Sequence, residues 1–420
     1  MNRKSNLIER IKILVNQRSY LKSFRQITIF SGGSFIAQIV MMIYAVIVAR
    51  ALGPSQLGIY NGLYAILGVT ITFVNFGLDL WMLNEAHHYD SVRLISGEVF
   101  SIKLVLGAIW AISSIFLLSV IRREIFSPLM VSLAVIDALC DILFNTISTS
   151  WSIVRKIRRI NIMLFISRIG KFFLLIGLIL FDSISPISII GSRFIISLIV
   201  LIISLIQTKP IINFGKLSFV KNILKRAVPF GFSDILAMIY GNIDVAILSF
   251  YSITNTGLYS PASGIIHALF IIPNSIYIYL LPKYSKQIID GNKNSTQNIL
   301  HQVLAIFTIV GLTISLILFF GGEIVVTLLL GSEYTSTGNL LKILSPIMLL
   351  KSISFGLALI IIITGNQKKR LLPQLLVSII NIIFNILLIP YFGLVSVAWI
   401  YTISELFLMI GYYILVIRNT

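Results

Sequence analysis

Apolar runs of eighteen or more residues recur along the whole length of this 420-residue chain. As a helix, a run of that length spans roughly 30 Å, which is the thickness of the hydrocarbon core of a bilayer. Charged residues make up only 11% of the sequence, whereas a soluble domain carries about 25%, so the chain cannot cover a water-facing surface. The sequence therefore predicts an all-α integral membrane protein with many spans.

Twelve transmembrane helices are expected, in two lobes. Their predicted ranges are 28–49, 57–80, 99–120, 127–150, 161–181, 186–207, 228–250, 258–281, 299–320, 339–364, 371–389 and 393–416. The longest connection, at 208–227, separates six helices in an N-terminal lobe (28–207) from six in a C-terminal lobe (228–420). No segment outside the spans is long enough to fold as a catalytic domain, so we expect a protein that is not an enzyme.

Basic residues are distributed unequally between the two sets of connections. One side receives 24 of them, whereas the other receives only Arg50, Arg122 and Arg123. Because basic connections stay in the cytoplasm, both termini are expected there. Residues 1–27 form either a basic amphipathic segment on the anionic membrane surface or a solvated basic tail. The net charge of +18 needs no nucleic-acid partner, because this sorting and attraction to anionic lipid account for it.

Two short stretches interrupt the apolar sequence at corresponding places. They are "ARALGPSQLGIYN" at 49–61, between the first and second spans, and "SITNTGLYSPASGI" at 252–265, between the seventh and eighth. A shift of 199 residues without gaps superposes identical residues in them, including Gly58 on Gly257 and Tyr60 on Tyr259. Six plus six helices of the same orientation predict parallel repeats, related by an axis along the membrane normal.

The residues of these two turns are expected to have structural roles. Gly53 and Pro54 favour a tight turn, because glycine permits unusual dihedral angles and proline restricts its own. Gly58 and Gly257 lack side chains, which allows helices to approach closely. The full set assigned to turn formation and packing is Arg50, Gly53, Pro54, Gly58, Tyr60, Gly257 and Tyr259.

Four basic side chains inside the spans are candidate substrate-binding residues. A charge at the centre of a bilayer costs about 2.5–3.5 kcal/mol on insertion scales, so such residues usually face a protein interior or a cavity. Lys171 and Lys351 fall near the midplane, Arg168 shares a helical face with Lys171, and Arg193 lies in the sixth span. They either line a water-filled cavity that holds a diphosphate and acidic sugars or form structural ion pairs with acids.

The intramembrane acids are candidates for ion coupling or for those ion pairs. They are Asp137, Asp141, Asp234, Asp244 and Glu405. One expected pairing joins Asp137 or Asp141 to Arg168 or Lys171 across adjacent helices. The spacing of cysteine and histidine indicates no metal site, and no cofactor is expected.

Four segments resemble a known family. They are "ARALGPSQLGIYN", "DVAILSFYSITNTGLYSPASGI", "LLLGSEYTSTGNLLKILSPIMLL" and "NIIFNILLIPYFGLVSVAWIYTISELF", and they look like the Wzx-type polysaccharide flippases. That family shares a superfamily with the multidrug and toxin extruders (MATE) and the lipid II flippases. Asp244 also matches a position where the resembling family often has aspartate.

The resemblance implies a fold, an activity and a location. It implies a MATE-like bundle of two pseudo-symmetric lobes that works by alternating access in the bacterial cytoplasmic membrane. The implied substrate is an undecaprenyl-diphosphate-linked oligosaccharide, moved to the outer leaflet for O-antigen, capsule or another surface polysaccharide. A polysaccharide polymerase and the chain-length machinery are candidate partners.

Three other functions stay open at this point. An ion-coupled drug extruder of the same fold would use Asp137, Asp141 or Glu405 for a proton or sodium ion, but the basic residues in the spans argue against a cation pocket. Lipid II flippases usually have more than twelve helices. Membrane glycosyl polymerases and ligases generally carry a large outer loop, whereas the outer connections here are only a few residues long.

Overall fold

The computed structural model describes residues 40–86, 91–212, 217–289 and 293–418. Nearly all of these residues are helical, and no strand occurs among them. Nine stretches within the described part are long and apolar enough to cross a membrane. The predicted amphipathic segment at 1–27 and the start of the first span lie outside the described residues.

The N-terminal lobe consists of one long kinked helix followed by shorter ones. The elements are a helix over 40–70, α2 (Thr72–Asn75), α3 (Leu78–Glu85), α4 (Val92–Ile121), α5 (Pro128–Ile153), α6 (Ile157–Leu180) and α7 (Pro186–Thr208). Local sequence explains where α5 and α7 begin. Each has proline at its first position and a serine cap before it, and Ser185 forms a capping box with Ser188 on α7.

The C-terminal lobe also consists of helices, and the three longest have 35, 38 and 47 residues. It contains α8 (Leu217–Tyr251), α9 (Ile253–Leu269), α10 (Ile271–Ile289), α11 (Lys293–Leu330), η2 (Ser332–Tyr334), α12 (Thr335–Leu344), α13 (Pro346–Ile363), η3 (Gln367–Arg370) and α14 (Leu371–Ile417). Kinks at Gly53 (φ 68°) and Gly393 (φ 57°) each divide one of the nine apolar stretches into two crossings. With α8, which is not among the nine, these stretches correspond to the twelve predicted spans, the first of which is described only from residue 40.

Two boundaries differ from the sequence prediction. The second span, expected as one helix over 57–80, breaks at Phe76 and Gly77, both of which have positive φ. The break coincides with a tertiary contact, because a Cβ atom on Gly77 would overlap the backbone of Gly231 on α8. In addition, α8 begins at Leu217, inside the connection expected at 208–227.

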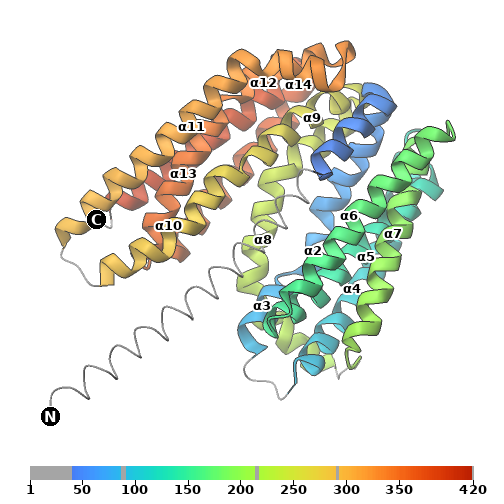
Figure 1. The fold of residues 1–420 in the computed structure, drawn as a ribbon, viewed down its shortest axis with the longest axis horizontal. Coiled ribbons are helices and arrows are strands. Elements are labelled where there is room, and N and C mark those ends of the chain that lie inside the picture. The colour runs from blue at the N-terminus through green and yellow to red at the C-terminus, as the bar shows by residue number, and fades with distance from the viewer. Residues whose placement is uncertain (1–39, 87–90, 213–216, 290–292, 419–420) are drawn as a thin grey trace, which may run out of the picture.

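The two lobes lie side by side and α8 runs between them (Figure 1). We call the end of the bundle near Arg155 and Lys368 the basic end, and the end near Gly53, Arg122 and Gly331 the opposite end. The largest hydrophobic core joins residues of both lobes, from the helix over 40–70 to α12 and α14. That core holds the lobes together toward the opposite end.

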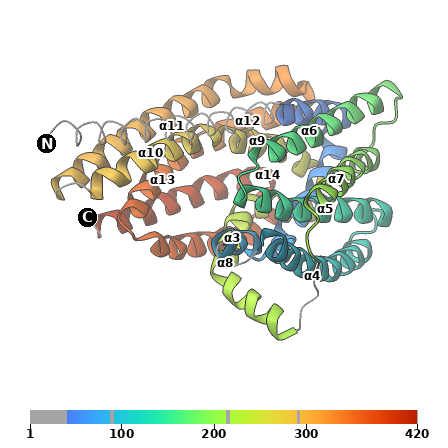
Figure 2. The ribbon, with the colours of Figure 1, turned by 60° about the horizontal axis from the view of Figure 1, so that its bottom comes forward.

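Contacts at the basic end are more limited. There α8 packs against α3 and α4 through a small apolar cluster that includes Trp81, Ile95 and Ile223, and α3 and α8 lie together in both views (Figures 1 and 2). Another core, which includes Phe307 and Tyr412, contains residues of the C-terminal lobe alone. Hence α8 is the main bridge between the lobes at this end among the described helices.

Candidate functional site

A buried carboxylate organises the polar interior of the N-terminal lobe. Asp137 on α5 is fully buried, and it accepts hydrogen bonds from the Tyr64 hydroxyl at 2.6 Å and the Ser197 hydroxyl at 2.6 Å. The Nε atom of Arg193 on α7 donates to the same carboxylate at 3.2 Å. A buried charge with this many partners is compensated, so Asp137 and Arg193 form an ion pair within the lobe.

Arg193 also connects α7 to the helix over 40–70. Its Nη1 atom donates to the Tyr60 hydroxyl at 2.6 Å, and its guanidinium lies 4.2 Å from the centre of the Tyr64 ring. Tyr60, which the sequence marked only as a turn residue, thus belongs to this cluster. Tyr64 and Ser197 were missed by the sequence analysis, because a lone hydroxyl in an apolar helix carries no recognisable pattern.

A second ion pair in this lobe joins α5 to α6. Lys171 Nζ lies 3.7 Å from a carboxylate oxygen of Asp141, which also accepts from Ser197 at 3.0 Å. The two side chains differ in access, since that of Asp141 is 47% exposed and that of Lys171 only 7%. Asp141 is therefore the acid of this cluster that an incoming molecule can reach.

Arg168 lies one turn before Lys171 on α6 and differs from the other intramembrane bases. It has no acid within ion-pair distance among the described residues, and its buried Nη1 atom has no hydrogen-bond partner there. An unpaired cation within a membrane span is a functional candidate, because its cost is not offset by a neighbouring acid.

In the C-terminal lobe, Lys351 and Glu405 form an ion pair between two helices. Lys351 Nζ on α13 donates to Glu405 Oε1 on α14 at 2.7 Å, and Glu405 is fully buried. Asp244 on α8 is also buried and accepts a 2.5 Å hydrogen bond from the Tyr259 hydroxyl on α9. Asp234 lies on α8 as well, but its side chain falls outside the described residues.

At the opposite end, the turns marked by the repeat face each other. A Cβ atom on Gly58 would overlap the carbonyl oxygen of Ile253, and one on Gly257 would overlap the carbonyl oxygen of Pro54. Three residues further along each helix, the Asn61 amide donates to the Ser260 hydroxyl at 2.7 Å. These contacts bring the backbones of the two lobes together without intervening side chains.

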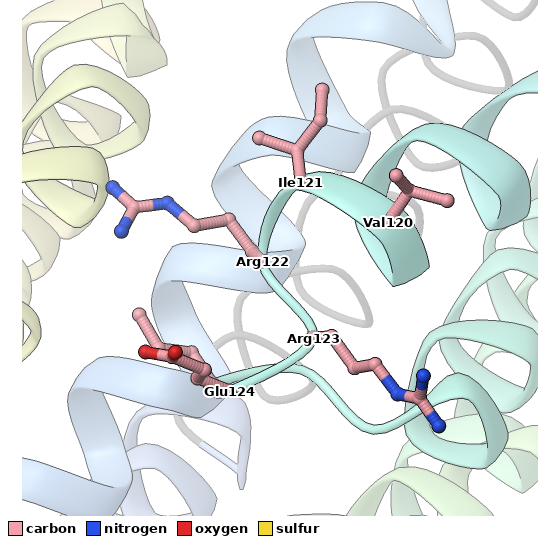
Figure 3. Close-up of a pocket in the computed structure, with 6 residues that line it drawn as sticks. Val120, Ile121, Arg122, Arg123 and Glu124 are labelled. Atoms are coloured by element: carbon pink, nitrogen blue, oxygen red, sulfur yellow. The ribbon is translucent and has the colours of Figure 1, made fainter.

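Two of the three basic residues at this end also bridge the lobes. Arg50 donates to the carbonyl oxygen of Leu328, and Arg122 donates to that of Phe250. The Arg122 guanidinium also lies 5.1 Å from the centre of the Phe250 ring. In Figure 3 Arg122 extends toward the C-terminal lobe, whereas Arg123 points the other way.

In the sequence, these arginines served only to assign orientation. The available signal was their rarity, since one of the two sets of connections contains no other basic residue. Tyr334 of η2, which the analysis did not single out, makes a further bridge to the carbonyl oxygen of Ala49 at 2.7 Å.

The described side chains of this site offer charges and hydroxyl groups for non-covalent binding. The bases and hydroxyls can bind anionic groups, and Asp141 can attract a cation. No group of three or more His, Cys, Asp or Glu side chains able to hold a metal ion occurs among the described residues.

Residues 23–288 match the family described as "Polysaccharide biosynthesis protein". Over 412 residues the chain is 25% identical to a putative O-antigen transporter of Escherichia coli (strain K12), and the alignment covers 94% of this chain and 92% of that one. It is 28% identical over 194 residues to the capsular polysaccharide biosynthesis protein CapF of Staphylococcus aureus. That alignment spans 46% of this chain and about half, 49%, of CapF.

Two solved structures share the fold. The lipid II flippase MurJ in an inward closed conformation superposes with a TM-score of 0.75 at 17% identity, covering 93% of this chain and 88% of MurJ. An inward-facing multidrug resistance MATE family transporter superposes with a TM-score of 0.72 at 12% identity, covering 91% and 93%. At these identities the likeness shows the fold, which is the MATE-like arrangement of two six-helix lobes.

Proposed function

The chain belongs to the polysaccharide biosynthesis protein family, and from this premise we propose that it flips undecaprenyl-diphosphate-linked oligosaccharide repeat units across the bacterial cytoplasmic membrane. The basic end would face the cytoplasm, as would both termini. The repeat unit would then serve O-antigen, capsule or another surface polysaccharide. The names of the two curated relatives support a polysaccharide-related cargo, and the flippase of similar fold supports a lipid-linked one.

The observation that carries the proposal is the uneven joining of the two lobes. The opposite end is joined by Gly58 against Gly257, by the Asn61–Ser260 hydrogen bond and by Arg122, whereas the basic end is bridged mainly by α8. A bundle joined in this way can admit a headgroup from the basic end. Separation of the opposite end and closure of the basic end would then release the headgroup on the other side.

The intramembrane cations would hold the diphosphate and acidic sugars during this exchange. Arg168 has no acid partner among the described residues, so it offers a full positive charge to a phosphate oxygen. Lys171 and Lys351 are paired with Asp141 and Glu405, and an entering anion would compete with those carboxylates. The polyprenyl tail would stay in the lipid throughout, and no covalent step is needed.

Deletion of the gene in the source bacterium tests this function directly. The expected result is loss of surface polysaccharide together with accumulation of single, unpolymerised lipid-linked repeat units on the cytoplasmic leaflet. Re-expression of the wild-type chain should restore the polymer. Normal surface polysaccharide combined with increased sensitivity to cationic compounds would instead identify an ion-coupled drug extruder and overturn the proposal.

A further inference from the structure

A pocket of about 230 Å³ lies within the C-terminal lobe, between α8, α13 and α14. Its lining includes Lys351, Ser354, Arg370, Gln374 and Tyr412. Along α13 it extends from Lys351 past Ser354 to Ala358, which corresponds to about 10 Å of helix. Arg370, one of the 24 basic residues that the sequence places in the connections on one side, lines this pocket together with Lys351.

Two polar groups in the lining of this pocket lack a hydrogen-bond partner within the described part of the chain. The buried Nε atom of Arg370 and the buried hydroxyl of Ser354 have no hydrogen-bond partner among the described residues. Buried donors in that state cost free energy until an acceptor reaches them. Two such atoms in the lining of one pocket indicate a ligand that supplies oxygen acceptors.

Neighbouring contacts hold the Arg370 guanidinium in place. It lies 5.3 Å from the centre of the Tyr412 ring, and the Tyr412 hydroxyl accepts a 2.8 Å hydrogen bond from the Gln374 amide. Contact with an aromatic ring attracts a guanidinium and restricts where it can lie. The guanidinium of Arg370 is therefore held in position before a ligand binds.

Charge and volume narrow the class of ligand. Glu405 balances the charge of Lys351, so Arg370 leaves the pocket with an excess positive charge that favours an anion. Ligand pockets for drug-sized molecules are about 300–1,000 Å³, and this one is smaller, so it would take a headgroup and not an oligosaccharide.

We infer that this pocket binds a phosphate or diphosphate group, held by Arg370, Ser354 and Lys351. The phosphate group is carried by the lipid-linked substrate, by a membrane phospholipid or by a soluble anion. The first of these sources rests on the proposed function. The pocket would then receive the diphosphate of the substrate from the basic end, where η3 carries Arg370.

The test is a binding measurement on the full-length protein in nanodiscs of phosphatidylcholine. The probes are undecaprenyl diphosphate, inorganic diphosphate and phosphatidylglycerol, each titrated separately. Arg370→Gln should weaken binding of at least one probe about tenfold or more, since it removes a charge-assisted hydrogen bond. Ser354→Ala should weaken binding of the same probe by a smaller factor, and it provides a second variant if Arg370→Gln fails to fold.

Lys368→Gln is the matched control, because it removes the same charge from an exposed position in the same turn. It should leave every affinity within about twofold of wild type. An effect on undecaprenyl diphosphate alone assigns the site to the lipid-linked substrate. An effect on phosphatidylglycerol alone assigns it to membrane phospholipid, and one that includes inorganic diphosphate shows that the anion suffices. Wild-type affinity of folded Arg370→Gln and Ser354→Ala for all three probes would overturn the site.

Failure of the site and failure of the proposed function are distinguishable. If gene deletion leaves surface polysaccharide normal while Arg370→Gln still weakens phosphate binding, the binding site is supported and the flippase function is overturned. If deletion blocks export while the Arg370→Gln and Ser354→Ala variants bind every probe like wild type, the flippase function is supported and the binding site is overturned.

Discussion

Gly58 and Gly257, which are 199 residues apart, face each other across the two lobes. A Cβ atom on Gly58 would lie 3.0 Å from the backbone nitrogen of Gly257, and one on Gly257 would lie 2.9 Å from that of Gly58. Such reciprocal contacts are what a two-fold axis between two copies of a motif produces. The 199-residue interval that relates the two turns in the sequence therefore also relates two residues that meet between the lobes.

The first prediction concerns this close approach. Gly58→Ala or Gly257→Ala should weaken closure of the opposite end and reduce export, because even a methyl group would overlap backbone atoms that cannot move aside. Overpacking of this kind costs about 1–3 kcal/mol. Export of surface polysaccharide in a complemented deletion strain is the measurement.

Gly68→Ala and Gly264→Ala are the controls for that experiment. They lie on the same two helices, and a Cβ atom at either position would meet nothing within 4 Å. Both should export at the wild-type level. Equal loss in the controls would show that helix flexibility, and not the contact between lobes, explains the effect.

The second prediction tests whether the lobes separate at this end. Asn61→Cys combined with Ser260→Cys, in a Cys140→Ala background, should form a disulfide on oxidation, since the native side chains are hydrogen bonded at 2.7 Å. The disulfide should abolish transport, and reduction should restore it. The two single-cysteine variants should be insensitive to oxidant. Wild-type transport by the locked protein would mean that the lobes do not need to part there.

The third prediction compares two neighbouring arginines. Arg122→Gln removes a charge-assisted hydrogen bond and a ring contact to Phe250, which together contribute about 1–2 kcal/mol to closure. A cysteine at position 260 should then react roughly tenfold faster with an impermeant maleimide added from outside. Arg123→Gln, whose side chain points away (Figure 3), should leave the rate unchanged. Equal rates in the two variants would contradict a role for Arg122 in holding the lobes together.

The fourth prediction separates pairing from substrate contact at Lys351. Lys351→Met leaves the carboxylate of Glu405 buried without its cation, and breaking such a pair costs about 3–5 kcal/mol of stability. The double variant Lys351→Met with Glu405→Leu should recover the melting temperature in detergent, because neither charge then remains buried. Export should stay low in both. Recovery of export with the double variant would show that Lys351 acts only as a partner of Glu405.

The fifth prediction concerns Arg168, which has no acid within ion-pair distance among the described residues. Arg168→Gln should reduce export at least about tenfold while the protein inserts normally, because it removes a charge that binds an anionic oxygen. Arg168→Lys should retain part of the activity. Arg159→Gln, an exposed position on the same helix, should behave like wild type. Intact export by Arg168→Gln would rule out a role for this side chain in holding the headgroup.

Much of the architecture could be predicted from sequence, because the relevant signals are local. Runs of apolar residues marked the spans. The division into lobes at 208–227 stays a prediction, and the second half of that connection is helical, since α8 begins at Leu217. The break at Phe76 and Gly77 was not predicted, because it coincides with the backbone of Gly231, more than 150 residues away. No pattern within the second span indicates that neighbour.

The candidate site could likewise be predicted only in part, because its contacts join residues far apart in the sequence. The position of a residue along its predicted span indicates its depth in the membrane, and on that basis Arg168, Lys171 and Lys351 were predicted to lie inside it. Depth does not indicate which of these bases forms an ion pair with an acid. The structure pairs Lys171 with Asp141 and Lys351 with Glu405, and it leaves Arg168 without an acid among the described residues.

Hydropathy and the 199-residue interval are properties of the chain alone, so they were enough to predict an all-α membrane protein with two related halves. The packing of the helices was needed to see that Arg122 and Arg50 join the lobes and that Arg370 lines a pocket with Lys351. The two kinds of feature depend on interactions of different range along the chain. Insertion into a bilayer depends on the composition of each segment. Ion pairs, contacts between lobes and pockets depend on distances of a few ångströms between segments far apart in the chain.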